Sequence, residues 1–130
     1  MSITNEDMKV LLKSQQGELD AVLMYNALAD VVKDEKEAET FRQLAAEEGH
    51  HASVFKGLTE QTLKPKKTLS TFIPLLYKLI GKKKLYPIIA KAEYGAFDTY
   101  APVAEKFSEI ESVKNDEYRH GDIVSGLLEG

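Results

Sequence analysis

The sequence predicts an all-α protein that folds as an antiparallel four-helix bundle, with a long crossover between its second and third helices. Apolar residues recur every three or four positions over four long segments, which is the spacing of one helix face. A link of only a few residues near Asp34 joins the first two segments, and short links make helices antiparallel neighbours. Prolines and lysines in residues 64–84 interrupt the pattern, and we expect the crossover there.

Composition narrows the class of protein. A chain of 130 residues suffices for a single domain, 1–130, with a real core. The net charge of -4 argues against nucleic acid as a partner. The lack of cysteine excludes a disulfide framework, an iron–sulfur cluster and a tetrathiolate iron site. No signal peptide and no apolar run of the ~18 residues that a membrane span needs are recognisable, so we expect a cytoplasmic protein.

The first two helices each carry acidic residues inside an apolar stripe. The first helix is expected to end near residue 32, and Asp34 offers the N-cap of the second. Glu18 lies about as far before this link as Glu48 and His51 lie after it. In an antiparallel pair, these three side chains should therefore meet at one level.

Two overlapping Glu-x-x-His pairs, Glu47/His50 and Glu48/His51, compete for the inward position on the second helix. The apolar residues around them are Phe41, Leu44, Phe55 and Leu58. Their spacing continues through positions 48 and 51, so Glu48 and His51 are expected to face inward. Glu47 and His50 then lie about 100° around the helix.

The second half of the chain repeats this plan. Glu93 lies in the apolar stripe of a third helix that is expected to begin near Leu85. The fourth helix carries a second Glu-x-x-His, Glu117 and His120. The repeat lies in the polar residues more than in the surrounding sequence, and it suggests a pseudo-twofold bundle with a site on the axis.

Four inward carboxylates and two imidazoles at one level predict a metal centre. So many buried carboxylates cannot all ionise without compensation, and two divalent cations would balance their charge. Oxygen-rich sites with one nitrogen per metal suit iron or manganese, and zinc is a possible substitute. The candidate metal ligands and catalytic residues are Glu18, Glu48, His51, Glu93, Glu117 and His120. The alternative is a metal-free bundle tied together by buried Glu–His ion pairs.

In the known pattern of carboxylate-bridged bundles, each ligand has a distinct role. Glu18 is expected to bind the metal of His51, and Glu93 the metal of His120. Glu48 and Glu117 are expected to bridge the two metals.

Acidic and small residues lie beside the candidate ligands. A ligating histidine usually donates its second N–H to a carboxylate, so Asp116 and Glu47 are candidate partners of the histidines; otherwise they are ordinary exposed acids. Glycines also crowd the ligands, at Gly17, Gly49, Gly95 and Gly121. They either allow close helix approach and room for a small oxidant, or have no special role.

The crossover 64–84 contains a short apolar segment, Phe72 to Ile80, followed by Lys82, Lys83 and Lys84. Its mixture of basic and apolar residues is compatible with weak contact with an anionic membrane surface. The simpler interpretation, which we favour, is a solvated linker packed over one end of the bundle.

The sequence resembles the rubrerythrin branch of the ferritin-like superfamily over nearly all of the chain except 64–84. The stretches that carry the resemblance are Glu18–Tyr25, Phe41–Ala52, Ile89–Glu93 with Tyr100, and Asp116–His120. The resemblance implies a non-haem di-iron centre that reduces hydrogen peroxide or reacts with dioxygen, and usually a homodimer.

Two departures from these relatives matter. Rubrerythrins commonly carry a rubredoxin module, and a chain without cysteine would need an external electron-donor protein instead. They also place a further Glu one turn after the third-helix ligand, where this chain has Ala96. The expected site is therefore more symmetric, as in bacterioferritins.

Three functions fit this reading. The leading hypothesis is a di-iron oxidoreductase of the peroxidase or oxidase type. The alternatives are a ferroxidase or iron-binding protein, and a membrane-associated di-iron hydroxylase resembling the quinone-modifying enzymes. Steady-state turnover with an electron donor separates the first two, and binding to lipid vesicles bears on the third.

Overall fold

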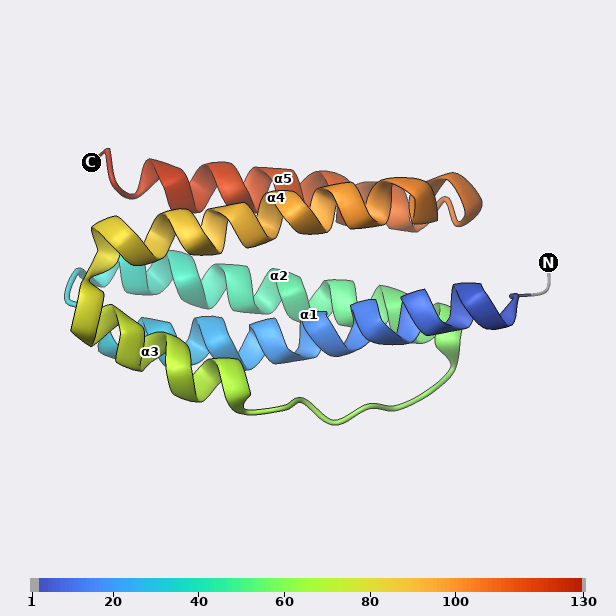
Figure 1. The fold of residues 1–130 in the computed structure, drawn as a ribbon, viewed down its shortest axis with the longest axis horizontal. Coiled ribbons are helices and arrows are strands. Elements are labelled where there is room, and N and C mark those ends of the chain that lie inside the picture. The colour runs from blue at the N-terminus through green and yellow to red at the C-terminus, as the bar shows by residue number, and fades with distance from the viewer. Residues whose placement is uncertain (1–2, 130) are drawn as a thin grey trace. The chain divides into compact units, whose positions relative to one another are not determined.

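The computed structural model describes residues 3–129, and this part of the chain contains five helices and no strand. The helices are α1 (Asn5–Val31), α2 (Glu35–Thr59), α3 (Thr68–Ile80), α4 (Lys82–Lys106) and α5 (Ile110–Gly126) (Figure 1). The prediction of an all-α fold is confirmed. Within the described residues, no helix is long and apolar enough to cross a membrane.

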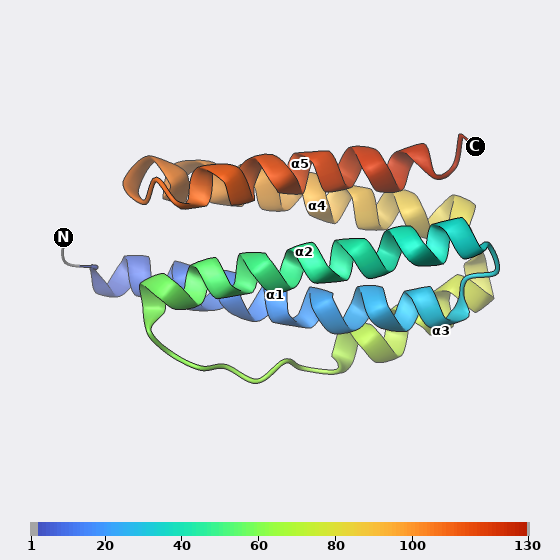
Figure 2. The same ribbon diagram turned by 180° about the vertical axis from the view of Figure 1, so that it is seen from behind.

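The helices form two compact units, Met1–Leu75 and Leu76–Gly130. In the first unit α1 packs on α2, and in the second α4 packs on α5. Each pair is an antiparallel hairpin, as Figure 2 shows. The boundary between the units falls inside α3. That residues 1–130 form a single domain stays a prediction.

Side-chain caps fix the helix starts in the first hairpin. The Thr4 hydroxyl accepts a hydrogen bond from the backbone N–H of Asp7 at 3.0 Å. The Asp34 carboxylate accepts hydrogen bonds from the N–H groups of Lys36 at 2.8 Å and Glu37 at 3.1 Å. Because these caps satisfy N–H groups that have no partner within the helix, they define where the chain turns and where α2 begins.

The non-helical part of the crossover, residues 60–67, is attached to α1. The side-chain amide of Gln15 donates to the carbonyl of Gln61, and that of Gln16 donates to the carbonyl of Lys64, both at 2.8 Å. The Asp20 carboxylate accepts from the backbone N–H of Lys66 at 2.7 Å. The segment therefore runs alongside α1 as an ordered strap (Figure 1).

The bounds of the crossover differ from those expected at 64–84. Helix α2 already ends at Thr59, because Glu60 adopts a left-handed conformation with φ 56°. Helix α4 begins at Lys82, three residues before Leu85, because Gly81 adopts φ 80° between α3 and α4. Both positions turn the chain sharply, which apolar periodicity alone does not reveal.

In the second hairpin, an aromatic cluster joins α4 to α5. The Tyr94 hydroxyl donates a 2.6 Å hydrogen bond to Asp122, and this bond raises the pKa of Tyr94 above its ordinary value. The rings of Tyr94 and Tyr118 lie 4.9 Å apart. The Tyr94 ring covers Gly121 so closely that a Cβ there would lie 2.5 Å from ring carbon Cε1. Gly121 is thus required for close helix approach.

We predict that Gly121→Ala destabilises the protein, whereas Gly49→Ala does not. Alanine favours a helix interior over glycine by up to about 1 kcal/mol at either position. A Cβ at Gly49 meets only Val22, at an ordinary 3.8 Å. At Gly121 it displaces the Tyr94 ring, and overpacking of this kind typically costs about 1–3 kcal/mol. Thermal unfolding of both variants tests this, and equal stabilisation of both would contradict the packing argument.

Candidate metal centre

All six candidate ligands are buried. As whole residues, Glu18, Glu48, Glu93 and Glu117 are at most 6% exposed, and His51 and His120 at most 1%. Charged side chains are almost never buried this fully unless they are paired or bound to metal. Each hairpin contains two of the glutamates and one histidine, so each holds a candidate cluster of metal ligands.

In the first hairpin, two carboxylates converge on one histidine nitrogen. His51 Nδ1 lies 2.9 Å from Glu48 Oε1 and 3.2 Å from Glu18 Oε2. One ligand atom from each of these three residues lies within 4.8 Å of the others. The expectation that α1 and α2 bring these side chains to one level is confirmed.

The second hairpin repeats the arrangement. His120 Nδ1 lies 3.2 Å from Glu93 Oε2 and 3.8 Å from Glu117 Oε1. These three residues also offer one ligand atom each within 4.8 Å of one another. In both hairpins the histidine therefore presents Nδ1 to a glutamate of its own helix and to a glutamate of the neighbouring helix.

The burial pattern of α2 agrees with the expected inward register. Glu48 and His51 are buried, whereas Glu47 is half-buried and His50 is exposed. The next apolar position differs slightly, because Leu58 is half-buried and Thr59 is buried in its place. Thr59 donates a 2.6 Å hydrogen bond to Gln15 Oε1, which accounts for this polar residue at the end of the stripe.

The charge of each cluster fits a divalent cation. A ring nitrogen carries at most one hydrogen, so it cannot fully serve two carboxylates at once. Two ionised glutamates with a protonated histidine still leave one negative charge in a buried place. Two ionised glutamates, a neutral histidine and one divalent cation sum to zero. Oxygen-rich ligands with one imidazole suit iron or manganese.

Other predicted neighbours have only partly defined roles. Asp116 accepts a 3.3 Å hydrogen bond from Arg119 on its own helix, and its partnership with a ligating histidine stays a prediction, as does that of Glu47. Tyr25 is buried and its ring stacks on Phe41 at 5.8 Å, which makes it part of the hairpin core. Among the four glycines near the ligands, only Gly121 is approached more closely than van der Waals contact.

Sequence reasoning missed the Tyr94–Asp122 contact. Both residues lie outside the apolar stripes, and no motif marks them. Gly121 is one of the four glycines near the ligands, and it is the sequence signal that could have led to the packed ring above it.

Fold and site together define a ferritin-like helical protein with buried Glu/His clusters suited to metal. The family model for rubrerythrin matches residues 9–128, so the chain belongs to the rubrerythrin family. Members of this family typically bind iron. No curated protein and no solved structure gives a significant match to this chain.

We predict that Glu48→Gln weakens metal binding far more than Glu47→Gln. Glutamine keeps the size of glutamate but lacks the charge that balances a cation. A carboxylate that only supports a ligand is worth roughly 10–100-fold in affinity, and a direct ligand should exceed that. Anaerobic Fe(II) titration, with Co(II) as a spectroscopic substitute, measures both variants.

The melting temperature provides an independent measure of metal binding by the Glu48→Gln and Glu47→Gln variants. Metal that binds only the folded protein stabilises it by mass action, by about 2.7 kcal/mol at 100 times Kd. Wild type and Glu47→Gln should melt higher with metal, and Glu48→Gln should lose most of this increase. If Glu47→Gln is the more damaging variant, the assignment of the inward pair as ligands is wrong.

Proposed function

We propose that this protein is a non-haem di-iron oxidoreductase that reduces hydrogen peroxide or reacts with dioxygen. The observation that carries the proposal is the pair of matching buried clusters, each with two glutamates and one histidine on neighbouring helices. Membership of the rubrerythrin family, whose proteins typically bind iron, supports it. We further propose that the two clusters act as one di-iron centre.

The residues would share the binding of two iron ions. His51 with Glu18 would hold one ion, and His120 with Glu93 would hold the other. Glu48 and Glu117 would be shared between the ions, which requires that the two hairpins present these carboxylates to each other. Manganese or zinc would occupy the same ligands as substitutes.

The chemistry has a simple electron balance. Two irons held by these six residues would supply one electron each, and with two protons these electrons would reduce one hydrogen peroxide to two water molecules. The buried glutamates keep compensating negative charge around the cations in either state. Residues 1–130 contain no cysteine for a rubredoxin-type site, and we propose that a separate electron-donor protein restores Fe(II). A homodimer in the cytoplasm remains the expected setting.

The first prediction of this proposal is two metal ions per chain and catalytic turnover. Protein loaded with Fe(II) without oxygen should contain two irons by elemental analysis. Peroxide and dioxygen are then added separately while the absorbance of Fe(III) is followed, and turnover is measured with a reducing system. Glu39→Gln serves as the control, because it changes an exposed carboxylate on α2 and leaves both Glu47 and the buried ligands intact.

The outcomes separate the alternatives. One iron or none per chain would sink the di-iron proposal. Oxidation of Fe(II) that occurs once, with no turnover when donor is supplied, would assign the protein to the ferroxidase or iron-storage class instead. Turnover that requires a membrane quinone analogue would favour the hydroxylase.

A second prediction follows from Ala96, which is half-buried on α4 one turn beyond Glu93. A carboxylate at that position could reach the metal of Glu93, whereas a methyl group cannot. Each iron should therefore keep its one imidazole in both oxidation states. X-ray absorption spectra of Fe(II) and Fe(III) protein count the imidazoles, and the loss of one on changing state would contradict the symmetric site.

A further inference from the structure

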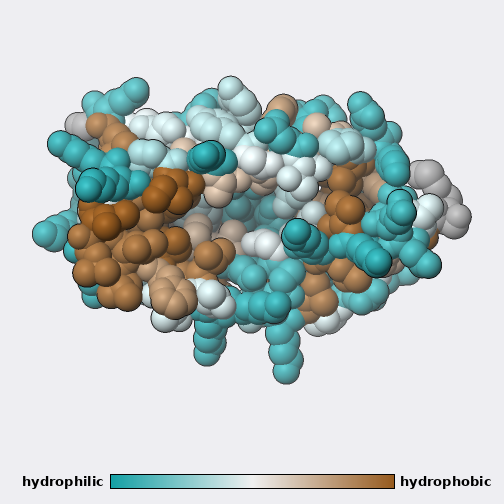
Figure 3. Space-filling model, in the orientation of Figure 1, coloured by the Kyte–Doolittle hydropathy of each residue, from teal (hydrophilic) through white to brown (hydrophobic). Residues whose placement is uncertain are grey.

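Helix α3 exposes an apolar face to solvent. Its exposed large hydrophobic residues are Leu69, Phe72, Leu75, Leu79 and Ile80. Phe72 is 57% and Leu79 70% exposed, which is unusual for side chains of this size gathered on one short helix. Figure 3 shows the resulting hydrophobic region over α3.

The opposite edge of α3 anchors it. Ile73 is buried, and the Tyr77 ring stacks on Tyr86 of α4 at 6.4 Å. Phe72, Leu75 and Leu79 are spaced three and four residues apart, so they share one helix face. Since this face points away from the anchoring contacts, α3 has more apolar surface than its packing uses.

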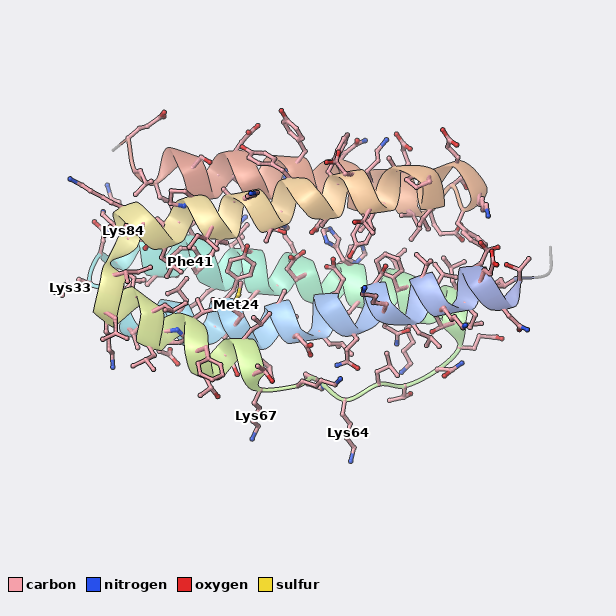
Figure 4. The ribbon with its side chains drawn as sticks, in the orientation of Figure 1. Met24, Lys33, Phe41, Lys64, Lys67 and Lys84 are labelled. Atoms are coloured by element: carbon pink, nitrogen blue, oxygen red, sulfur yellow. The ribbon has the colours of Figure 1, made fainter. Side chains whose placement is uncertain are left out.

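Lysines flank α3 in the sequence. Residues 61–92 contain eight of the 17 Lys and Arg residues of the chain and none of its 21 Asp and Glu residues. Lys64, Lys66 and Lys67 precede α3, Lys78 lies within it, and Lys82, Lys83 and Lys84 follow it. Lys64 and Lys67 extend away from the helices into solvent (Figure 4). In an acidic protein, such segregation points to an anionic partner.

We propose that α3 is an interfacial helix that docks this protein on an anionic lipid surface. Its apolar face would enter the boundary between headgroups and acyl chains while the lysines contact the anionic headgroups. A helix of 13 residues is about 20 Å long, shorter than the ~30 Å hydrocarbon core, so it would lie in the plane of the surface. The proposal does not depend on the metal centre.

A second copy of the chain fits this face less well. Among the described residues, the other exposed large hydrophobics are Val10 on α1, Ile88 on α4 and Tyr118 on α5, one on each helix, whereas α3 carries five. No other helix in residues 3–129 exposes as many large hydrophobic side chains, so the matching apolar face in a second copy would be that of α3. Pairing two α3 faces would bring the lysine clusters of both copies together, which costs energy by like-charge repulsion.

The test is co-sedimentation with two kinds of vesicle, pure phosphatidylcholine and phosphatidylcholine with phosphatidylglycerol. Wild type should bind the anionic vesicles, less strongly at high salt, and show little binding to the neutral ones. The double variant Phe72→Ser with Leu79→Ser should bind on the order of 100-fold more weakly, because two large side chains no longer enter the lipid. Val10→Ser, on an exposed part of α1, is the apolar control.

Lysine variants test the electrostatic contribution to lipid binding separately. The triple variant Lys66→Gln, Lys67→Gln and Lys83→Gln should also lower partitioning on the order of 100-fold, since each lysine near an anionic surface contributes about a factor of five. Its control has the same net charge but changes three exposed lysines elsewhere: Lys9→Gln, Lys13→Gln and Lys36→Gln. Circular dichroism and melting confirm that each variant is folded.

Several results would overturn the proposal. One is wild type that stays in the supernatant, and another is equal binding to neutral and anionic vesicles. A third is that the serine variant or the flanking-lysine variant binds as well as its control. Equilibrium sedimentation tests the alternative that the α3 face mediates a contact between two copies of the chain. A wild-type dimer that the serine variant dissociates, with no vesicle binding, would make the α3 face a contact between copies.

Discussion

The constraint on which this fold depends is the burial of carboxylates inside helix pairs. Each hairpin holds two glutamates and one histidine at a few per cent exposure, where like charges repel strongly and water cannot relieve them. Such a cluster is stable only if the carboxylates take up protons or a cation balances them. The core is thus not purely apolar. A cation that binds the buried carboxylates would also stabilise the folded protein, so metal binding and folding are thermodynamically linked.

The geometry that satisfies this constraint is set far from the ligands, at the turn. Glu18 lies 13 residues before the end of α1 at Val31, and Glu48 lies 13 residues after the start of α2 at Glu35. The three-residue link and the Asp34 cap determine both of these separations from the turn. Moving the cap by one residue would turn the ligand face of α2 by about 100° relative to α1. The length of the link therefore determines which residues of α1 and α2 lie at the same level, and so it positions the buried cluster of the first hairpin.

The parts predicted from sequence are those that local periodicity determines. The inward register of Glu48 and His51 followed from the apolar residues around it, because a half-buried helix repeats every 3.6 residues. The start of α4 at Lys82 did not follow, since it depends on the φ of one glycine. Nor did the contact of Tyr94 with Asp122, because the pairing of surface residues 28 positions apart leaves no periodic trace.

Amphipathicity has a similar limit in α3, because a sequence shows an apolar face but not what covers it. The structure adds an observation that bears on this face, namely that the segment leading into α3, residues 60–67, is attached to α1. Gln15, Gln16 and Asp20 bind the backbone of residues 61–66, so Lys64 and Lys66 start from a backbone held on α1 rather than from a loose loop. Lysines fixed in this way lose less entropy on meeting a charged surface. A surface that binds them would therefore also orient the α1–α2 hairpin, and with it the buried cluster of Glu18, Glu48 and His51.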